Sequence, residues 1–273
     1  MNLSGLARGM AIPVRSRIYR PEPATSAMPR LAPYTAKLAA DTQEFRDALR
    51  LRYEVFNVEL HEGLQSAHAS GHDFDPFDAV VDHLIVKCAY SRRVVGTYRL
   101  QTGGAARQNL GYYSQREFDL APFEPLRAQL LELGRACIHQ EHRNTEVLML
   151  LWKAIAKYGI QRGCRYLIGC SSLSSQDPAL GMAVYSKLKK FLAPPEFQTR
   201  PQPGFACDAG LAAGPDSDAA KVPKLLRAYL SIGAQICGPP ALDAEFGTID
   251  FLTLLDLARV PQGMFSRMTQ SQG

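Results

Sequence analysis

Apolar and polar positions repeat with helical and extended periods from residue 34 onward. Residues 34–40 have the period of a first strand. Asp41 and Glu44 then have the spacing of a capping box, and apolar side chains follow at helical spacing. We therefore predict a helix from Asp41 to about residue 57.

The next regular feature is a pair of apolar runs, 80–89 and 94–100, separated by a short basic turn. Two such runs around a turn predict a β-hairpin. Polar residues 101–109 are predicted to form a loop, and the stretch up to residue 128 has no clear period.

A strand, helix and strand are predicted in succession over 130–170. Residues 130–139 read as a strand, 146–162 as an amphipathic helix, and 166–170 as a fully buried strand. A strand, a crossover helix and a second strand form a βαβ unit, so this region should contribute two parallel strands.

The remaining pattern completes one α/β domain over residues 34–273. Helices are predicted at 179–191 and 221–233, and a strand at 248–255. We predict a mixed central sheet flanked by helices, with a C-terminal extension. Residues 1–33 hold five arginines, one acid and five prolines, and are expected to be a flexible basic arm; contact of the arm with anionic lipid or protein is the alternative.

Charged residues interrupt two apolar patterns. Arg52 falls on the apolar stripe of the first helix, where it needs a carboxylate partner. Glu132 and Arg135 lie three residues apart in an apolar strand, which would put them on opposite faces. Gly134 is a natural position for a bulge that re-aims one of them. The alternative is a purely structural ion pair, for instance between Glu132 and Arg52.

An acidic loop precedes the hairpin and offers partners for these arginines. Asp73, Asp75 and Asp78 lie among aromatic residues, without the glycine and terminal glutamate of an EF-hand calcium loop. We expect them to pair with Arg52, with Arg135, or with a further arginine in the hairpin, Arg99.

Composition narrows the class of protein. The chain has 273 residues, a hydrophobic fraction of 46% and a net charge of +5, which suits an acidic partner or an anionic membrane surface but is too small for a nucleic-acid footprint. Six cysteines show no CxxC pair, which suits a reducing compartment. No transmembrane or secretory segment is apparent, so we expect a cytoplasmic protein, perhaps peripheral to the inner membrane.

Several well-known chemistries find no support in the sequence. There is no P-loop, no Rossmann glycine motif and no G-x-S-x-G elbow. His139 and His142 form an H-x-x-H pair, and we expect no third ligand near them, so no metal site is predicted.

A series of short motifs, taken together, resembles one enzyme family. In order along the chain they are Leu51-Arg-Tyr-Glu-Val-Phe56, Asp75-Pro-Phe-Asp78, Val95-Gly-Thr-Tyr-Arg-Leu100, Gly111-Tyr-Tyr-Ser-Gln-Arg-Glu-Phe-Asp119, Glu132-Leu-Gly-Arg135, Leu151-Trp152 and Asp243-Ala-Glu-Phe-Gly-Thr-Ile-Asp250. The series resembles the ornithine-lipid N-acyltransferases and the related N-acyl amino acid synthases, which share the GNAT fold with acyl-homoserine-lactone synthases.

The resemblance implies transfer of a fatty or 3-hydroxy fatty acyl group from a phosphopantetheine arm to the α-amine of an amino acid, with ornithine favoured. GNAT proteins that bind coenzyme A usually have glycines where this chain has residues 142–147, and here there are none. This departure favours acyl carrier protein as donor, with no bound cofactor. The alternatives are a general long-chain N-acyl amino acid synthase, an acyl-homoserine-lactone-type signal synthase, or a protein that only binds acyl chains.

The resemblance also implies roles for particular residues. Glu132 would take a proton from the amine, and Cys170 or Ser171 would protonate the thiolate. The acceptor would be bound or framed by Arg52, Phe56, Asp75, Asp78, Arg99 and Arg135. The acyl-pantetheine arm would contact Leu133, Ala136, Cys137, Ile138, Arg143 and Ser171. A basic cluster at Lys187, Lys189 and Lys190 is expected to dock the acidic carrier protein.

Overall fold

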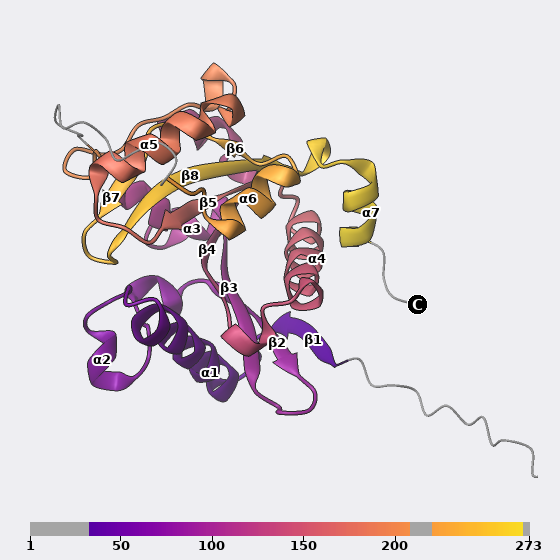
Figure 1. The fold of residues 1–273 in the computed structure, drawn as a ribbon. Coiled ribbons are helices and arrows are strands. Elements are labelled where there is room, and N and C mark those ends of the chain that lie inside the picture. Colours follow the sequence, from indigo (N-terminus) through magenta and orange to yellow (C-terminus); the bar gives the residue numbers. More distant parts are fainter. Residues whose placement is uncertain (1–32, 208–219, 270–273) are drawn as a thin grey trace, which may run out of the picture. The chain divides into compact units, whose positions relative to one another are not determined.

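A single mixed sheet organises the described part of the chain, which in the computed structural model comprises residues 33–207 and 220–269 (Figure 1). Its strands follow the order β1-β2-β3-β4-β5-β8-β6, and β7 pairs with β8. Only β4 and β5 pair in parallel; the other pairs are antiparallel. The strands are β1 (Tyr34–Leu38), β2 (Asp82–Cys88), β3 (Val94–Thr102), β4 (Leu130–Ile138), β5 (Tyr166–Leu173), β6 (Gln235–Ile236), β7 (Ala241–Asp243) and β8 (Thr248–Asp256).

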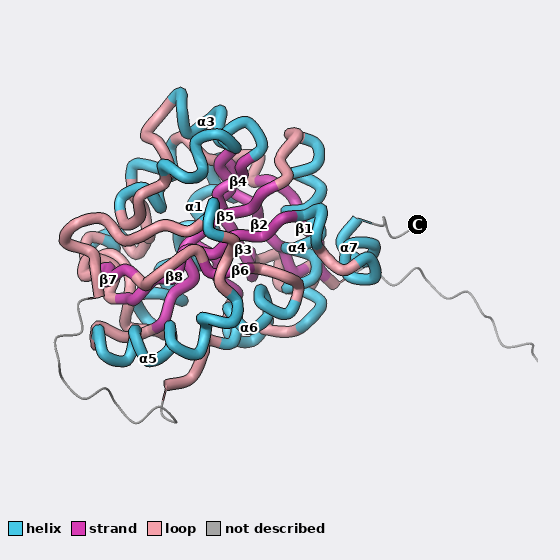
Figure 2. Tube along the Cα trace, turned by 90° about the horizontal axis from the view of Figure 1, so that it is seen from above, coloured by secondary structure: helices cyan, strands magenta, loops and turns pink. Residues whose placement is uncertain are grey.

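Helices pack on both faces of this sheet, as the predicted fold class requires. They are α1 (Thr42–Tyr53), α2 (Ala67–Ser70), α3 (Gly103–Gln108), α4 (Thr145–Gln161), α5 (Pro178–Leu188), α6 (Lys224–Ser231) and α7 (Gln262–Thr269). Successive residues of β2 divide between the faces: Leu84 and Val86 join the core under α4, whereas Ile85 joins the core under α1. In Figure 2 and in Figure 1, α7 lies beside α4.

The predicted elements agree with the structure over most of the domain. The βαβ unit is present as β4, α4 and β5, and the C-terminal strand β8 lies directly against β5. The prediction of a loop over 101–109 was wrong. The side chain of Thr102 accepts a hydrogen bond from the Ala105 backbone N–H and starts the short helix α3.

The first helix also differs from the prediction at its end. The α-helical part stops at Tyr53, and the chain continues as a π-helix, Glu54–Glu59. A π-helical turn adds one residue per turn and is common at functional sites. It places the Phe56 ring at the edge of the pocket described below.

Two further expectations concern the basic arm and membrane-spanning helices. Residues 1–32, nearly all of the predicted basic arm, lie outside it. Within it, no helix combines the length and the apolar composition needed to cross a bilayer.

Candidate active site

The two parallel strands separate partway along their length. β4 and β5 pair at Leu130, Leu131 and Glu132, and the pairing ends there, although both strands continue for several residues. The strands meet closely at the point of separation, since a Cβ added to Gly169 would lie 2.3 Å from the Leu133 carbonyl oxygen. Beyond this point the two strands are unpaired, which leaves a gap between β4 and β5.

A bulge in β4 changes the direction of the side chains at this point. Opposite β3, Arg99 pairs with Gly134 but Thr97 pairs with Cys137, so β4 has one extra residue. The extra residue is Arg135, whose φ of 50° is unusual for a residue with a side chain. In a regular strand Cys137 would lie on the same face as Leu131, but Leu131 packs under α4 and Cys137 under α1. The predicted bulge thus brings Arg135 to the face that holds Glu132.

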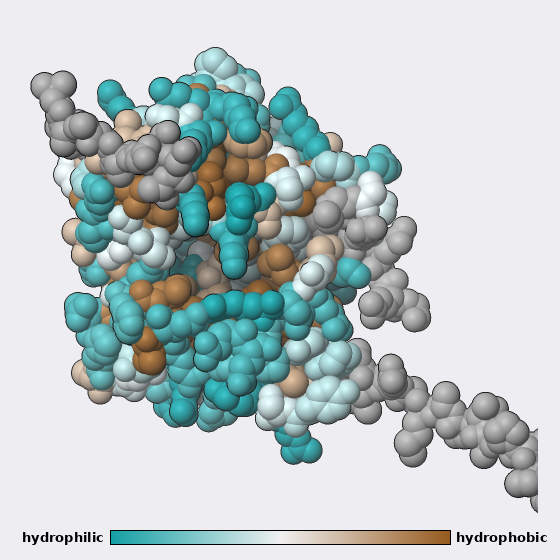
Figure 3. All heavy atoms as spheres, viewed as in Figure 1, coloured by the Kyte–Doolittle hydropathy of each residue, from teal (hydrophilic) through white to brown (hydrophobic). Residues whose placement is uncertain are grey.

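A pocket with two lobes occupies the gap. The polar lobe lies on the α1 side, and its lining includes Phe56, Arg99, Tyr113, Glu132, Arg135, Cys170, Asp243 and Asp250. The apolar lobe lies on the α4 side, and its lining includes Tyr98, Trp152, Ile155, Leu167, Gly169, Tyr229 and Ile232. Leu133, Gly134, Arg135, Ala136, Cys170, Ser171 and Tyr229 border both lobes. In the orientation of Figure 1, the surface is hollowed between the α1 side and the α5–α6 side (Figure 3).

Glu132 is buried at the inner end of the polar lobe. Its carboxylate accepts hydrogen bonds from the backbone N–H groups of Tyr113 (2.9 Å) and Ser114 (2.8 Å) and from the Ser114 hydroxyl (2.7 Å). Burial raises the pKa of Glu132, and these three bonds oppose that shift. The suggested ion pair between Glu132 and Arg52 was wrong, because Arg52 binds other carboxylates.

Those carboxylates belong to the acidic loop, as the sequence predicted. Arg52, Arg99 and Arg135 alternate with Asp73, Asp75 and Asp78 in a buried set that we call the ionic frame. Arg52 donates to Asp78 (2.6 and 3.1 Å) and to Asp73 (3.2 Å). Arg99 donates to both oxygens of Asp75 at 2.7 Å. Arg135 donates to Asp75 at 3.0 Å.

The frame contains equal numbers of positive and negative groups and stiffens one wall of the pocket. The guanidinium groups beside them lower the pKa values of Asp73 and Asp78 despite burial, so both carboxyls are ionised. Arg99 and Arg135 line the polar lobe. Arg52, Asp75 and Asp78 do not; they lie behind it and hold the first two in place.

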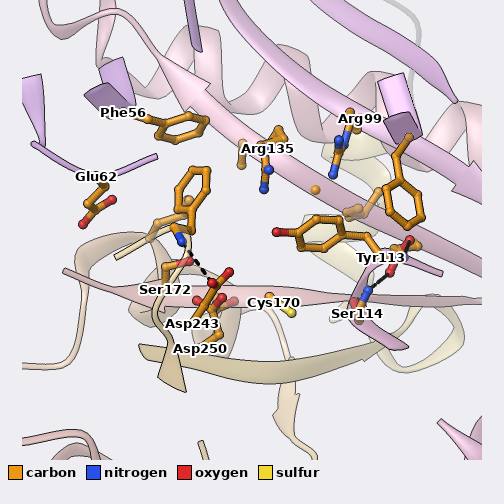
Figure 4. Close-up of a pocket in the computed structure, with 18 of the residues that line it drawn as sticks. Phe56, Glu62, Arg99, Tyr113, Ser114, Arg135, Cys170, Ser172, Asp243 and Asp250 are labelled. Carbon is orange, nitrogen blue, oxygen red and sulfur yellow. Dashed lines mark hydrogen bonds between the residues drawn. The ribbon is translucent and has the colours of Figure 1, made fainter. Parts of the chain in front are cut away.

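The ring of Tyr113 is surrounded by arginines. The guanidinium carbons of Arg135, Arg99 and Arg116 lie 4.8, 5.0 and 5.4 Å from its centroid. Figure 4 shows the Tyr113 hydroxyl pointing into the pocket below Arg135. Burial raises the Tyr113 pKa, so the hydroxyl is protonated and can donate a hydrogen bond there.

Across the pocket from the frame lies a group of carboxyls that we call the acidic floor: Glu117, Asp243 and Asp250. In Figure 4, Asp243 and Asp250 lie opposite Arg99 and Arg135, with Cys170 beside them. Carboxyl oxygens of Glu117 and Asp250 and the Cys170 sulfur lie within 4.8 Å of one another. The Cys170 thiol donates to Glu117 at 3.8 Å.

Two carboxyl groups of the acidic floor have raised pKa values. Burial and repulsion between its carboxylates raise the pKa values of Glu117 and Asp250, so this pair retains a proton near neutral pH. Burial and the neighbouring carboxylates also raise the Cys170 pKa, which keeps it as a thiol.

Sequence reasoning assigned no chemical role to Tyr113, Ser114 or the acidic floor. The signal available was polar residues inside apolar surroundings: Glu117 next to Phe118, and Asp250 between Ile249 and Phe251. A charged residue in such a position requires a partner or a function, as Arg52 requires its carboxylates.

Of the six residues predicted to contact the acyl-pantetheine arm, three line the pocket and three do not. Leu133, Ala136 and Ser171 border both lobes. Cys137 and Ile138 pair with β3 beyond the bulge, and Cys137 packs into the core under α1. Arg143 lies at the surface, bound to both oxygens of Glu59 at 2.5 and 2.7 Å.

Glu141 lies close to His139 and His142 and forms with them a possible set of metal ligands, which the spacing of the two histidines did not predict. Ligand atoms of His139, Glu141 and His142 lie within 4.8 Å of one another. The Tyr34 hydroxyl is hydrogen-bonded to Nδ1 of His142 at 3.0 Å, so one ring nitrogen is already engaged.

The chain is similar to several known proteins. A family model described as an acetyltransferase (GNAT) domain matches residues 51–153. An L-ornithine N(alpha)-acyltransferase of Rhodobacter capsulatus is 31% identical over 252 residues, which cover 88% of this chain and 97% of that protein. A protein of the same name from Brucella abortus is 29% identical, covering 85% of this chain and 87% of its own. The crystal structure of the AHL synthase LasI is 11% identical, with a TM-score of 0.49 over 88% of this chain and 98% of that one.

Proposed function

This chain belongs to the L-ornithine N(alpha)-acyltransferase family, and we propose that it transfers a fatty acyl group from acyl carrier protein to the α-amine of L-ornithine. The observation that carries the proposal is the gap between β4 and β5, which has an apolar lobe on one side and a charged lobe on the other. Joining a fatty chain to a charged amine requires these two environments side by side.

The apolar lobe suits the acyl chain of the donor. Its walls come from α4 (Trp152, Ile155), from the strands on either side of the gap, and from Tyr229 of α6. Burial of a hydrocarbon chain contributes about 0.8 kcal/mol per methylene group. The pantetheine arm would then lie between β4 and β5, with the thioester at the junction of the lobes near Ala136 and Cys170.

The N-terminus of α4 supports a carrier protein rather than coenzyme A as donor. A helix N-terminus can bind a pyrophosphate through its free N–H groups. Here the Asn144 side chain accepts the Val147 N–H at 2.9 Å, and Glu146 adds a negative charge in the same turn. Arg143, the neighbouring cation, is occupied by Glu59.

The chemistry uses groups at the junction of the lobes. The ammonium of the acceptor loses a proton to Glu132, whose Oε2 accepts only one of the three hydrogen bonds. The free amine nitrogen bonds to the thioester carbon, and backbone N–H groups of β4 stabilise the oxyanion. The nitrogen of the intermediate releases its second proton to solvent as the carbon–sulfur bond breaks, so that a neutral amide forms. The thiolate takes a proton from Cys170, and a proton from Glu117 can restore the Cys170 thiol across 3.8 Å.

Assays with purified full-length protein, acyl carrier protein loaded with a long acyl chain, and L-ornithine test this function. Mass spectrometry should detect one amide-linked fatty amino acid, and its absence would contradict the proposal. Glu132→Gln should lower turnover at least about 100-fold, whereas Glu141→Gln, at an exposed glutamate outside the pocket, should not.

Glu132 also anchors the turn at Tyr113 and Ser114, so the assay must separate a base from an anchor. Loss of a base leaves KM and thermal stability nearly unchanged, and part of the activity returns at high pH, where the amine is deprotonated without help. Loss of an anchor raises KM and lowers the melting temperature at every pH.

The basic cluster after α5 remains a proposal for carrier docking. Lys187 donates to the Ala220 carbonyl at 2.8 Å, while the ammonium groups of Lys189 and Lys190 lie over aromatic rings. Charge reversal at Lys189 and Lys190 should raise KM for acyl carrier protein and spare short acyl-pantetheine donors. Equal losses with both donors would exclude docking.

A further inference from the structure

We propose that the acidic floor, Glu117, Asp243 and Asp250, is a cation subsite that recognises the terminal ammonium of a diamino acid acceptor. The inference rests on the proposed function, because the acceptor would occupy the same lobe. It adds the residues that distinguish ornithine from an amino acid with an uncharged side chain.

The charge balance of the pocket differs between its two walls. The three arginines of the ionic frame are matched by its three aspartates, so the frame has no net charge to offer. Arg135 acts on Glu117 and Asp250 from across the pocket, but it is already paired with Asp73 and Asp75. The nearby Arg116 is paired with Glu245 at 2.6 Å. The acidic floor therefore has no cation of its own among the described residues.

The acidic floor contains buried oxygen atoms that accept no hydrogen bond in the described structure. Asp250 is 96% buried and borders the polar lobe, yet its Oδ1 has no hydrogen-bond partner in the described structure. Oε1 of Glu117 is in the same condition. Leaving a buried polar atom unpaired destabilises the protein, so such atoms usually have a partner in the working state. An ammonium group has three N–H donors and a positive charge, and it would satisfy both needs.

Oppositely charged side chains lie at the two sides of the polar lobe. Arg99, Arg135 and Tyr113 lie at one side of it, and Asp243 and Asp250 lie at the other (Figure 4). Ornithine carries a carboxylate and the reacting amine at one end and an ammonium at the other, separated by three methylene groups. With the carboxylate near the arginines and the tyrosine hydroxyl, the second ammonium would point to the acidic floor.

Comparison of two acceptors tests the inference. L-Norvaline has the carbon skeleton of ornithine without the terminal amine. With wild-type protein and a long-chain acyl carrier protein, kcat/KM for L-ornithine should exceed that for L-norvaline by about 10- to 100-fold, the contribution of a charge-assisted hydrogen bond. Equal values for the two acceptors would overturn the proposal.

Isosteric neutral variants then assign the preference to the floor. Asp250→Asn should lower kcat/KM for L-ornithine by about 10- to 100-fold and leave that for L-norvaline within about 2-fold. The change removes a repulsive charge, so the variant should fold at least as stably as wild type. Asp243→Asn keeps the oxygen that accepts the Glu245 and Phe246 N–H groups and should act in the same direction. Glu141→Gln, at an exposed glutamate outside the pocket, is the control and should change neither acceptor.

Calorimetric binding separates this inference from the proposed function. Wild-type protein that binds L-ornithine more tightly than L-norvaline, with the difference lost in Asp250→Asn, supports the subsite even if no acyl transfer is found. Acyl transfer with no difference between the acceptors overturns the subsite and leaves the acyltransferase. A metal ion retained by the purified protein, with ornithine preference abolished by a chelator, would assign the acidic floor to that ion and overturn the proposal.

Discussion

Replacing Arg52 by glutamine tests whether the ionic frame stabilises the fold that carries the site. The guanidinium is fully buried and donates three hydrogen bonds to Asp73 and Asp78, at 2.6 to 3.2 Å. The variant leaves both carboxylates buried without their main counter-ion. Asp73 keeps Arg135 at 3.3 Å and Asp78 keeps Arg99 at 3.5 Å, so compensation is partial.

The expected cost follows from this geometry. Removing one partner of a buried ion pair typically costs about 3–5 kcal/mol. The free energy of unfolding of a natural domain is about 5–15 kcal/mol, so the loss is a large fraction of the total. Arg50→Gln is the matched control: it lies on the same helix, is 68% exposed, and pairs with Glu54 four residues on. Such a surface pair contributes about 0.3–0.5 kcal/mol.

Urea unfolding followed by circular dichroism measures both variants on one scale. The Arg52 variant should lose several-fold more free energy of unfolding than the Arg50 variant. If the two losses agree within about 0.5 kcal/mol, the frame does not stabilise the fold and the reasoning from burial fails.

Two further predictions concern the gap and the acidic floor. Gly169→Ala places a methyl group 2.3 Å from the Leu133 carbonyl oxygen, so it should force β4 and β5 apart and lower acyl transfer at least about 10-fold, whereas Gly263→Ala, where nothing lies within 4 Å, should not. Glu117 has a raised pKa in the folded state, so the stability of the wild-type protein should fall as the pH rises above the ordinary carboxyl pKa. Urea unfolding between pH 5 and pH 9 measures this fall. In Glu117→Gln the fall should be smaller, and the variant should be more stable than wild type at pH 9.

The parts of the fold that depend on local pattern could be predicted from the sequence. The period of α4 and the apolar runs on either side of it are sufficient for a βαβ unit. The charged residues in β4 were informative for the same reason, because Glu132 and Arg135 violate a strong apolar pattern. Gly134 drew attention to the bulge, although the residue with the unusual φ is Arg135 itself.

The acidic floor required knowledge of which strands are neighbours. Asp250 reaches Cys170 and Ser172 only because β8 runs antiparallel to β5, with Ser172 opposite Asp250. Glu117 comes from an irregular segment whose position depends on the bonds of Tyr113 and Ser114 to Glu132. No period in the sequence indicates that these segments meet, so the partners of Glu132 and the floor were beyond pattern reasoning.

The contrast between the two charged walls of the pocket indicates which of them is functional. The ionic frame balances its own charges and pairs each of its side chains with an oppositely charged one, so it contributes to the fold without any ligand, although Oδ1 of Asp73 and Nε of Arg135 make no hydrogen bond in the described structure. The acidic floor does neither, and its raised pKa values mean that it destabilises the folded state at neutral pH. Proteins retain such locally unfavourable groups where activity requires them. A cationic acceptor would remove the imbalance on binding, so the free energy that the floor withholds from folding becomes available for selecting the substrate.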